Sequence, residues 1–211
     1  MNPKLPLIGL CLCGQLLSSC GQTAHTQREP QNSGKDSPDK VVQVDWPAQL
    51  ADIQARLIRD PNSAFLHNQA AVAYDALGDF DNFDREINLA MKLEPDNSID
   101  CYVAYAVYKR RHLRDKQILV LGKALQIDPG NPMGHYEKAA IFEDDRKWVD
   151  ALAEYQTTKR LLDWVRSDQK HFHNNSWTYL DRRGNPYDVS WQITYIEDDL
   201  RRVRAAMQNQ N

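Results

Sequence analysis

Few residues in this sequence have the types and the spacing that metal chemistry needs. His171 and His173 flank a phenylalanine, and alternate residues of a strand could face one ion. Asp168 and Asp181 are within reach in sequence, but neither they nor a cysteine completes a convincing ligand set. Two loop histidines are therefore the favoured interpretation, and we assign no metal site. The alternative is a metal-dependent hydrolase built on the segment after residue 166.

The cysteines offer no catalytic site either. Cys11 and Cys13 lie in an apolar N-terminal run, Cys20 follows it closely, and Cys101 stands alone in the remainder. As a nucleophile, Cys101 would need a neighbouring base, which the sequence does not suggest, so we expect a half-buried helix thiol. The sequence also lacks a Gly-rich phosphate loop, a nucleophile elbow and a paired helix histidine motif. We therefore predict no enzyme activity, no catalytic residue and no cofactor.

The N-terminal residues predict export. Lys4 precedes an apolar run over residues 5–17, which is shorter than the roughly 20 residues of a membrane-spanning helix. The tetrapeptide Leu-Ser-Ser-Cys that ends at Cys20 resembles the lipobox of bacterial lipoproteins. That resemblance implies removal of residues 1–19, lipidation of Cys20 with fatty acids such as palmitate, and anchoring to a membrane of the cell envelope. Gly21, where an Asp would favour the inner membrane, favours the periplasmic face of the outer membrane. The alternative is an ordinary signal peptide with a chance cysteine.

The residues that follow are typical of a tether. Residues 20–45 would comprise the lipidated cysteine and a segment rich in Gln, Ser, Pro, Asp and Lys, which has too few large apolar side chains to fold. The formal net charge of the chain is −3, and it becomes one unit more negative once Lys4 is removed. Because basic residues form no strong cluster, we exclude nucleic acid as a partner.

From Trp46 onward, the composition changes and apolar residues recur with the period of a helix. A longer sequence repeat is superimposed on this pattern. Pro61, Pro95 and Pro129 stand 34 residues apart. Further residues keep the same phase: Ala90 and Ala124; Tyr74, Tyr108 and Phe142. Several coincident positions in one phase are not chance, so the chain is mostly α-helical and built from tandem units.

These units resemble the tetratricopeptide repeat family over residues 64–165. The first unit matches best, through Ala71, Tyr74, Gly78, Phe80, Ala90 and Pro95. The residues that depart from the family pattern are Phe83 in the first unit, His112, Arg114 and Gln117 in the second, and Arg146, Thr158 and Asp163 in the third. The resemblance implies an all-α fold: a short α–α superhelix of three helix pairs, with a leading helix and a C-terminal capping segment.

Helix-starting Asn and Ser residues after each proline place the element boundaries. The domain would span residues 46–166, with repeats at about 64–97, 98–131 and 132–165. The expected helices are 46–59, 63–77, 80–93, 98–111, 114–127, 132–144 and 147–166. Residues 167–211 would form a loop or a short hairpin around Gly184 and Asn185, and then a capping helix on which Ile193, Ile196 and Leu200 recur at helical spacing.

Family resemblance also implies a binding surface, because the first helices of the pairs line the inner face of such stacks and bind peptides or partner helices. In this register, the partner-binding groove would be lined by Phe65, Asn68, Val72, Ile99, Tyr102, Ala106, Lys109, Met133, Tyr136 and Glu137. Tyr102 and Tyr136 lie one repeat apart and are the predicted anchors. The alternative is that these two residues pack against the terminal segment or a neighbouring repeat.

Some family members bind a partner's C-terminal carboxylate with a fixed set of basic and Asn residues, which this sequence lacks. Asn68, Val72, Val103, Met133 and Glu137 stand at those positions. An internal segment or a helix of a protein partner is therefore the expected ligand. The sequence predicts a membrane-tethered protein-interaction adaptor. A structural envelope protein that only self-associates is the alternative.

Overall fold

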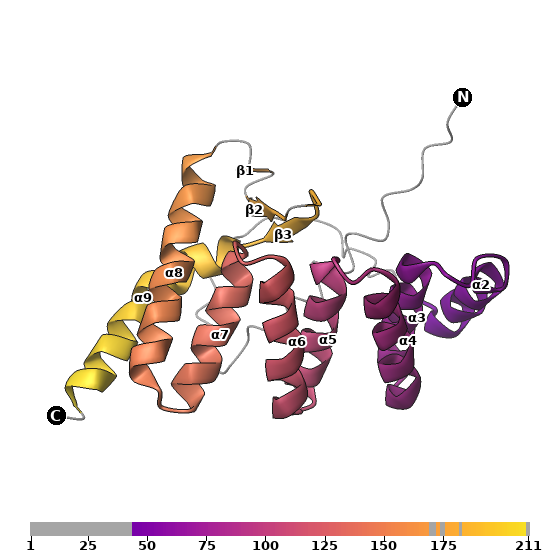
Figure 1. The fold of residues 1–211 in the computed structure, drawn as a ribbon, viewed down its shortest axis with the longest axis horizontal. Coiled ribbons are helices and arrows are strands. Elements are labelled where there is room, and N and C mark those ends of the chain that lie inside the picture. The colour runs from indigo at the N-terminus through magenta and orange to yellow at the C-terminus, as the bar shows by residue number, and fades with distance from the viewer. Residues whose placement is uncertain (1–43, 169–171, 174–175, 182, 210–211) are drawn as a thin grey trace, which may run out of the picture. The chain divides into compact units, whose positions relative to one another are not determined.

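The computed structural model describes residues 44–168, 172–173, 176–181 and 183–209. The predicted signal peptide, Cys20 and nearly all of the predicted tether lie outside these residues. The described chain divides into two compact units, residues 44–95 and residues 96–209, and each is treated by itself. The ribbon and its helix labels are drawn in Figure 1.

The first unit consists of α2 (Trp46–Arg59), α3 (Ala64–Ala76) and α4 (Phe80–Leu93). Each helix begins where a side chain accepts a hydrogen bond from a free backbone N–H of the first turn. Asp45, Ser63 and Asp79 are these capping residues, and they accept from the third residue beyond themselves at 3.0–3.3 Å. The cap positions explain why these helices start where the sequence predicts.

Small residues on α3 let its neighbours approach closely. Ala70 and Ala73 are buried together with Ile53 of α2, and Trp46 and Tyr74 pack against that cluster. Phe83 of α4, which departs from the family's usual alanine, is fully buried and stacks on Phe80 with the ring centroids 5.6 Å apart. The larger ring is therefore accommodated in the core of this unit.

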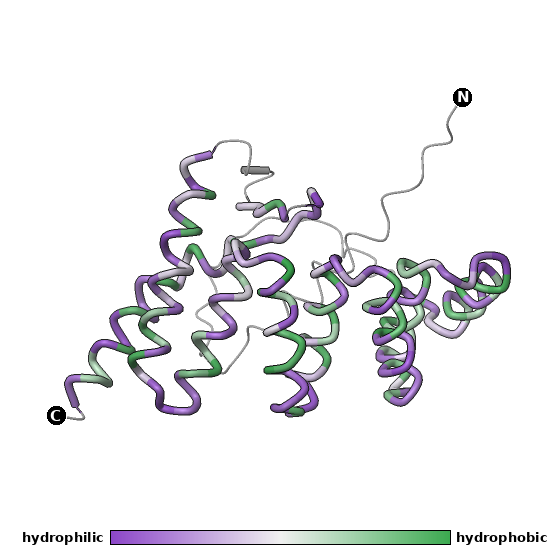
Figure 2. The backbone as a smooth tube through the Cα atoms, viewed as in Figure 1, coloured by the Kyte–Doolittle hydropathy of each residue, from purple (hydrophilic) through white to green (hydrophobic). Residues whose placement is uncertain are grey.

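The second unit contains two more helix pairs and the C-terminal segment. α5 (Ser98–Arg110) pairs with α6 (Arg114–Ile127), and α7 (Pro132–Asp144) pairs with α8 (Trp148–Ser167). Asn97 and Asn131 cap α5 and α7. Figure 2 shows both hydrophobic and hydrophilic residues along these helices. α5 is buried on all sides, because every residue from Asp100 to Tyr108 is buried. The consecutive antiparallel pairs confirm the all-α, tetratricopeptide-like class.

The same backbone turn recurs between the two helices of each pair. Gly78 has φ +77°, and the residues one and two repeats further on, His112 and Arg146, have φ 56° and 57°. These two replace the family's glycine, and they keep its left-handed conformation at a steric cost. The repeat geometry therefore persists where its sequence signature is lost.

After α8 the chain forms a small antiparallel sheet with strand order β1-β2-β3. The strands are β1 (Phe172–His173), β2 (Ser176–Leu180) and β3 (Pro186–Asp188), and Tyr179 is the register partner of Tyr187. Of the two structures expected here, the hairpin is therefore the one observed. It leads into α9 (Ser190–Gln208), which packs along α8 through buried residues such as Ile196, Leu200 and Val203.

Candidate functional site

The predicted groove residues of the first unit lie on one face of α3. Phe65 is 56% exposed, and Asn68 and Val72, three and seven residues further on, are half-buried. This spacing places all three on the same side of the helix. The opposite side carries the buried residues Ala70 and Ala73. In this unit, the predicted inner face therefore presents a large aromatic ring to solvent.

Four of the seven predicted groove residues of the second unit are buried in this structure. Tyr102 is 1% exposed and Tyr136 is 6% exposed. Ala106 and Met133 are also buried, whereas Ile99, Lys109 and Glu137 are half-buried. The physical reason is that the chain's own C-terminal segment covers this face, which is the alternative weighed for the two tyrosines. Their role in binding a partner stays a prediction.

The β2–β3 hairpin contributes two tyrosines to this cover. The Tyr187 ring meets the Tyr102 ring edge-on at 5.4 Å between centroids, and its hydroxyl lies 3.0 Å from the Ser98 hydroxyl at the start of α5. The Tyr179 hydroxyl donates to the Asp128 carboxylate, with O–O distances of 2.9 and 3.1 Å. Ser98 and Asp128 are almost fully buried. The hairpin is thus held by polar contacts made out of solvent.

Asp181 shapes the turn that presents these tyrosines. Its Oδ1 accepts from the backbone N–H groups of Arg183 and Asn185 at 2.9 and 2.8 Å. Its Oδ2 accepts from the Asn185 amide at 2.9 Å. Three of the hydrogen bonds to this buried carboxylate are therefore internal to the turn. The Ser98 hydroxyl lies 3.5 Å from Asp181 Oδ2, so the same carboxylate also links the turn to the start of α5.

The beginning of α9 covers Tyr136 of α7. Trp191 packs edge-on against the Tyr136 ring at 5.3 Å, and the Tyr136 hydroxyl donates to Asp199 Oδ2 at 2.5 Å. Arg202 donates to Asp199 and to Glu143, which joins α9 to α7. Burial raises the pKa of Tyr136, and the neighbouring Asp199 raises it further. Tyr136 is therefore a neutral hydrogen-bond donor at any physiological pH.

The covered face retains polar atoms with no hydrogen-bond partner within the described part of the chain. These include the Tyr102 hydroxyl, the Asn131 amide nitrogen and, on α9 itself, the Gln192 amide oxygen. Gly134 of α7 faces the Tyr102 hydroxyl so closely that a Cβ there would lie 2.4 Å from its oxygen. The helices thus pack tightly around Tyr102 without satisfying its hydroxyl.

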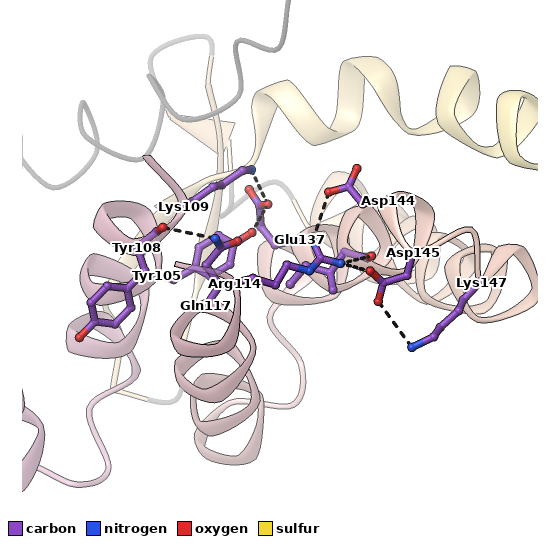
Figure 3. A network of polar contacts seen from close by, with 10 residues as sticks. Tyr105, Tyr108, Lys109, Arg114, Gln117, Glu137, Asp144, Asp145 and Lys147 are labelled. Atoms are coloured by element: carbon purple, nitrogen blue, oxygen red, sulfur yellow. Dashed lines mark hydrogen bonds and ion pairs between the residues drawn. The ribbon is translucent and has the colours of Figure 1, made fainter. Parts of the chain in front are cut away.

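A second polar network joins the two helix pairs of this unit (Figure 3). Glu137 of α7 accepts from Tyr105 and Lys109 of α5, each at 2.7 Å. Arg114, which stands where the family has an aromatic residue, donates to the Ile141 carbonyl oxygen at 2.9 Å. Arg114 also bonds to the acidic residues at the C-terminal end of α7. Lys109 and Glu137, both predicted to bind a partner, are therefore paired with each other here.

Sequence reasoning missed a pair of histidines that recur at equivalent repeat positions. His135 lies 2.6 Å from Glu154 through Nδ1 and 2.9 Å from the Pro129 carbonyl oxygen through Nε2. His67 makes the same two contacts, with Glu86 at 2.6 Å and the Pro61 carbonyl oxygen at 3.0 Å. The spacing in the sequence could have revealed this pair, because the histidine, the glutamate and the proline each recur 68 positions later. In the middle repeat, Cys101 and Val120 occupy the two positions.

The absence of a metal site at His171 and His173 remains a prediction from the sequence alone. His171 and the side chain of His173 lie outside the described residues. Among the residues that are described, no group of three or more His, Cys, Asp or Glu side chains could hold a metal ion. No described helix is both long and apolar enough to span a bilayer. Cys101 is fully buried rather than half-buried, and burial raises the pKa of its thiol to about 11.

Comparison with known proteins identifies the fold. No protein-family model matches the chain, and no curated protein matches it in sequence. Solved structures do match, among them the crystal structure of MamA, a tetratricopeptide-type protein. The TM-score to MamA is 0.50 at 12% sequence identity, covering 79% of this chain and 89% of that one. At this identity the likeness shows the fold alone, so the chain is a helical-repeat protein with a tetratricopeptide-like fold.

Proposed function

We propose that this protein is a membrane-tethered adaptor that binds a segment or helix of another protein on the inner helices of its repeats. Consecutive antiparallel helix pairs expose helix faces on which a segment or helix of a partner can lie. The lipobox-like residues before Cys20 support a lipid anchor, and the composition of residues 21–45 supports a flexible tether. A chain anchored in this way presents its repeats to partners in the envelope.

The observation that carries the binding proposal is the exposed face of α3. Phe65 is a large aromatic side chain with 56% of its surface in solvent, and Asn68 and Val72 extend the same face. One repeat later, the equivalent positions are Ile99, which is half-buried, and Tyr102 and Ala106, which are buried. The aromatic ring at the first of these positions on α3, Phe65, is the most exposed side chain of the two sets. Aromatic anchors flanked by smaller polar and apolar groups are typical of protein-binding surfaces.

A crosslinking experiment with a matched control tests this face. A photoreactive amino acid is placed at Phe65 in one variant and at Ile58 in another, and partners are captured in the native envelope. Ile58 is the control because it is apolar, 84% exposed and in the same unit, but lies on α2. We expect a discrete crosslinked protein from position 65 only. Identical patterns from both positions would show that α3 carries no specific surface.

The anchor is tested separately. Metabolic labelling with an alkyne fatty acid should mark the wild-type chain and leave the Cys20→Ala variant unlabelled. Because a cleaved soluble protein and a lipoprotein fractionate differently, the wild type should also sediment with membranes. A Cys13→Ala variant serves as the control, since Cys13 would be removed with the signal peptide. Labelling that survives in Cys20→Ala, or that is missing from the wild type, contradicts the lipid anchor.

A further inference from the structure

We propose that the turn between α5 and α6 binds the surface of an anionic phospholipid bilayer. The site, called the basic turn below, consists of residues 109–116 together with the exposed side chains of Ile118 and Leu119 on α6. It is distinct from the inner helix faces and needs no protein partner. The inference goes beyond the proposed function, although it rests on the proposed tether for part of its binding strength.

The basic turn differs in charge from the two equivalent turns of the protein. Its residues, KRRHLRDK, include five basic side chains and one acidic side chain. One repeat earlier, residues 75–82 read DALGDFDN, and one repeat later, residues 143–150 read EDDRKWVD. The earlier turn has three acidic residues and no basic one, and the later turn has four acidic and two basic residues. Positive charge is therefore concentrated at one turn of the three.

Two of the five basic residues tie the turn to the next helix pair. Lys109 donates to Glu137 at 2.7 Å, and Arg114 donates to the Ile141 carbonyl oxygen at 2.9 Å. The other three basic residues are exposed, and the exposed Asp115 offsets one of their charges: Arg110, Arg111 and Lys116. Near an anionic lipid surface, each exposed basic residue strengthens binding about fivefold. This local excess is smaller than the basic stripe of a nucleic-acid-binding protein, but it is large enough to favour such a surface.

Apolar side chains lie beside these charges on the first turns of α6. Leu119 is 72% exposed and Ile118 is 47% exposed. Lys116, three residues before Leu119, lies on the same face of the helix, and its ammonium group lies over the Tyr108 ring, 5.1 Å from the centroid. Single exposed apolar residues are common on protein surfaces. Two adjacent ones beside a basic turn combine the two features of segments that bind at a bilayer interface, where basic groups meet phosphates and apolar groups enter the acyl boundary.

The basic turn lies at one end of the α5–α6 helix pair (Figure 1). His112 has φ 56°, the left-handed conformation with which the chain reverses direction between the two helices. A turn at the end of a helix pair can meet a flat bilayer surface, whereas an extended protein segment binds in a groove or along a sheet edge. A lipid anchor at Cys20 and a tether over residues 21–45, with an r.m.s. reach of about 25–30 Å, would keep the turn at a high local concentration near the membrane.

Co-sedimentation of the purified full chain with vesicles tests this contact. All proteins carry Cys20→Ala, so that no lipid anchor contributes, and vesicles of phosphatidylcholine are compared with vesicles that also contain phosphatidylglycerol. Because the apolar residues 5–17 can bind any bilayer, the measured quantity is the ratio of the two partition coefficients.

The turn variant carries Arg110→Gln and Arg111→Gln. The matched control carries Arg201→Gln and Arg204→Gln, which remove two exposed arginines of α9 and change the net charge by the same amount. We expect the preference for anionic vesicles to fall roughly tenfold in the turn variant and much less in the control. An equal fall in both variants, or a protein with all its arginines that shows no preference for anionic vesicles, overturns the proposal.

Photocrosslinking in the native envelope shows what the apolar part of the basic turn contacts. A photoreactive amino acid at position 119 should give phospholipid adducts, and one at position 58 should give far fewer, because Ile58 is an exposed apolar residue of the other unit. Equal lipid adducts at the two positions, or a discrete protein adduct at position 119, overturn the proposal, and the second result assigns the turn to a protein partner. These results need no adaptor partner and the vesicle comparison needs no anchor, so failure of the proposed function is distinguishable from failure of the basic turn.

Discussion

The histidine–glutamate pair of the third repeat gives the most detailed prediction. The two ring nitrogens of His135 face the Glu154 carboxylate at 2.6 Å and the Pro129 carbonyl oxygen at 2.9 Å. Both neighbours are hydrogen-bond acceptors when the carboxylate is ionised, so the ring must donate from both nitrogens and carry a positive charge. Lys138 approaches the second carboxylate oxygen at 2.6 Å. The pair therefore joins the start of α7 to α8 by charge-assisted hydrogen bonds.

The middle repeat supplies the perturbation, because Cys101 and Val120 replace both members of the pair together. We predict that His135→Cys and Glu154→Val each lower the free energy of unfolding by about 2 kcal/mol, since a charge-assisted bond contributes about 1.5–3 kcal/mol. Both side chains are only 16% exposed, so solvent screens them little. The double variant should lose less than the sum of the singles by about 1–2 kcal/mol, because it leaves no buried charge without its partner. Each single should lower Tm by about 4–8 °C.

The contribution of the His135–Glu154 pair to stability changes with pH in a direction that follows from the two pKa shifts. Burial by itself lowers the pKa of His135, but the hydrogen bonds to Glu154 and to the Pro129 carbonyl overcome it and raise the pKa above the ordinary value. Stability from the charged ring is therefore complete below the unfolded-state pKa of about 6.5, and it is lost as the pH rises through the folded-state pKa. Burial raises the pKa of Glu154, and its bonds to His135 and Lys138 outweigh this and lower it. Its contribution is present above the unfolded-state pKa of about 4.3 and is lost as the pH falls through the folded-state value.

Urea denaturation of the four proteins at several pH values is the assay. The difference in unfolding free energy between the wild type and the double variant should be largest near pH 5–6.5 and should shrink on both sides of that window. Single-variant losses that add to within about 0.5 kcal/mol in the double variant would refute the reasoning. A difference that stays constant from pH 4 to pH 9 would refute it too, because the charges would then make no contribution.

Three further predictions follow from backbone geometry and burial. His112→Gly and Arg146→Gly should each raise the unfolding free energy by about 0.5–1 kcal/mol, because glycine adopts their positive φ without steric cost. Thermal denaturation measures this change, and an unchanged or lower Tm would contradict the prediction. Gly134→Ala should lower stability by about 1–3 kcal/mol, since its Cβ would lie 2.4 Å from the Tyr102 hydroxyl, and a neutral effect would show that α7 can shift. The Cys101 thiol, buried and with its pKa raised to about 11, should react with a disulfide reagent at pH 8 only after denaturant is added, so fast labelling of the folded chain would disprove its burial.

The helices could be predicted from the sequence because their boundaries are encoded locally. Each expected helix from Trp46 to the end of α8 begins and ends within one residue of the observed one. Ser63, Asn97 and Asn131 follow the recurrent prolines and cap the first helices of the three pairs through their own side chains. Such signals need only a few neighbouring residues. They are therefore readable without any knowledge of tertiary contacts.

The cover over α5 and α7 could not be predicted in the same way, because it depends on pairs far apart in the chain. Ser98 meets Tyr187 across 89 positions, and Tyr136 meets Asp199 across 63. No periodicity encodes such pairs, and a tyrosine on an inner helix has the same signature whether it faces a partner or its own chain. The apolar character of the predicted groove was a sign of burial as much as of binding.

The departures of the second and third repeats from the family pattern correspond to what each repeat contacts. Where the histidine and glutamate are lost, Cys101 and Val120 replace them together and remain buried, so neither side chain is left as an isolated charge. Where the C-terminal segment covers α5 and α7, Tyr102 and Tyr136 stand in place of the half-buried Asn68, and their rings contact Tyr187 and Trp191 of that segment. Arg114 replaces an aromatic residue and bonds to the next helix pair instead. Changes that occur in matched sets are those of repeats adapted to different neighbours.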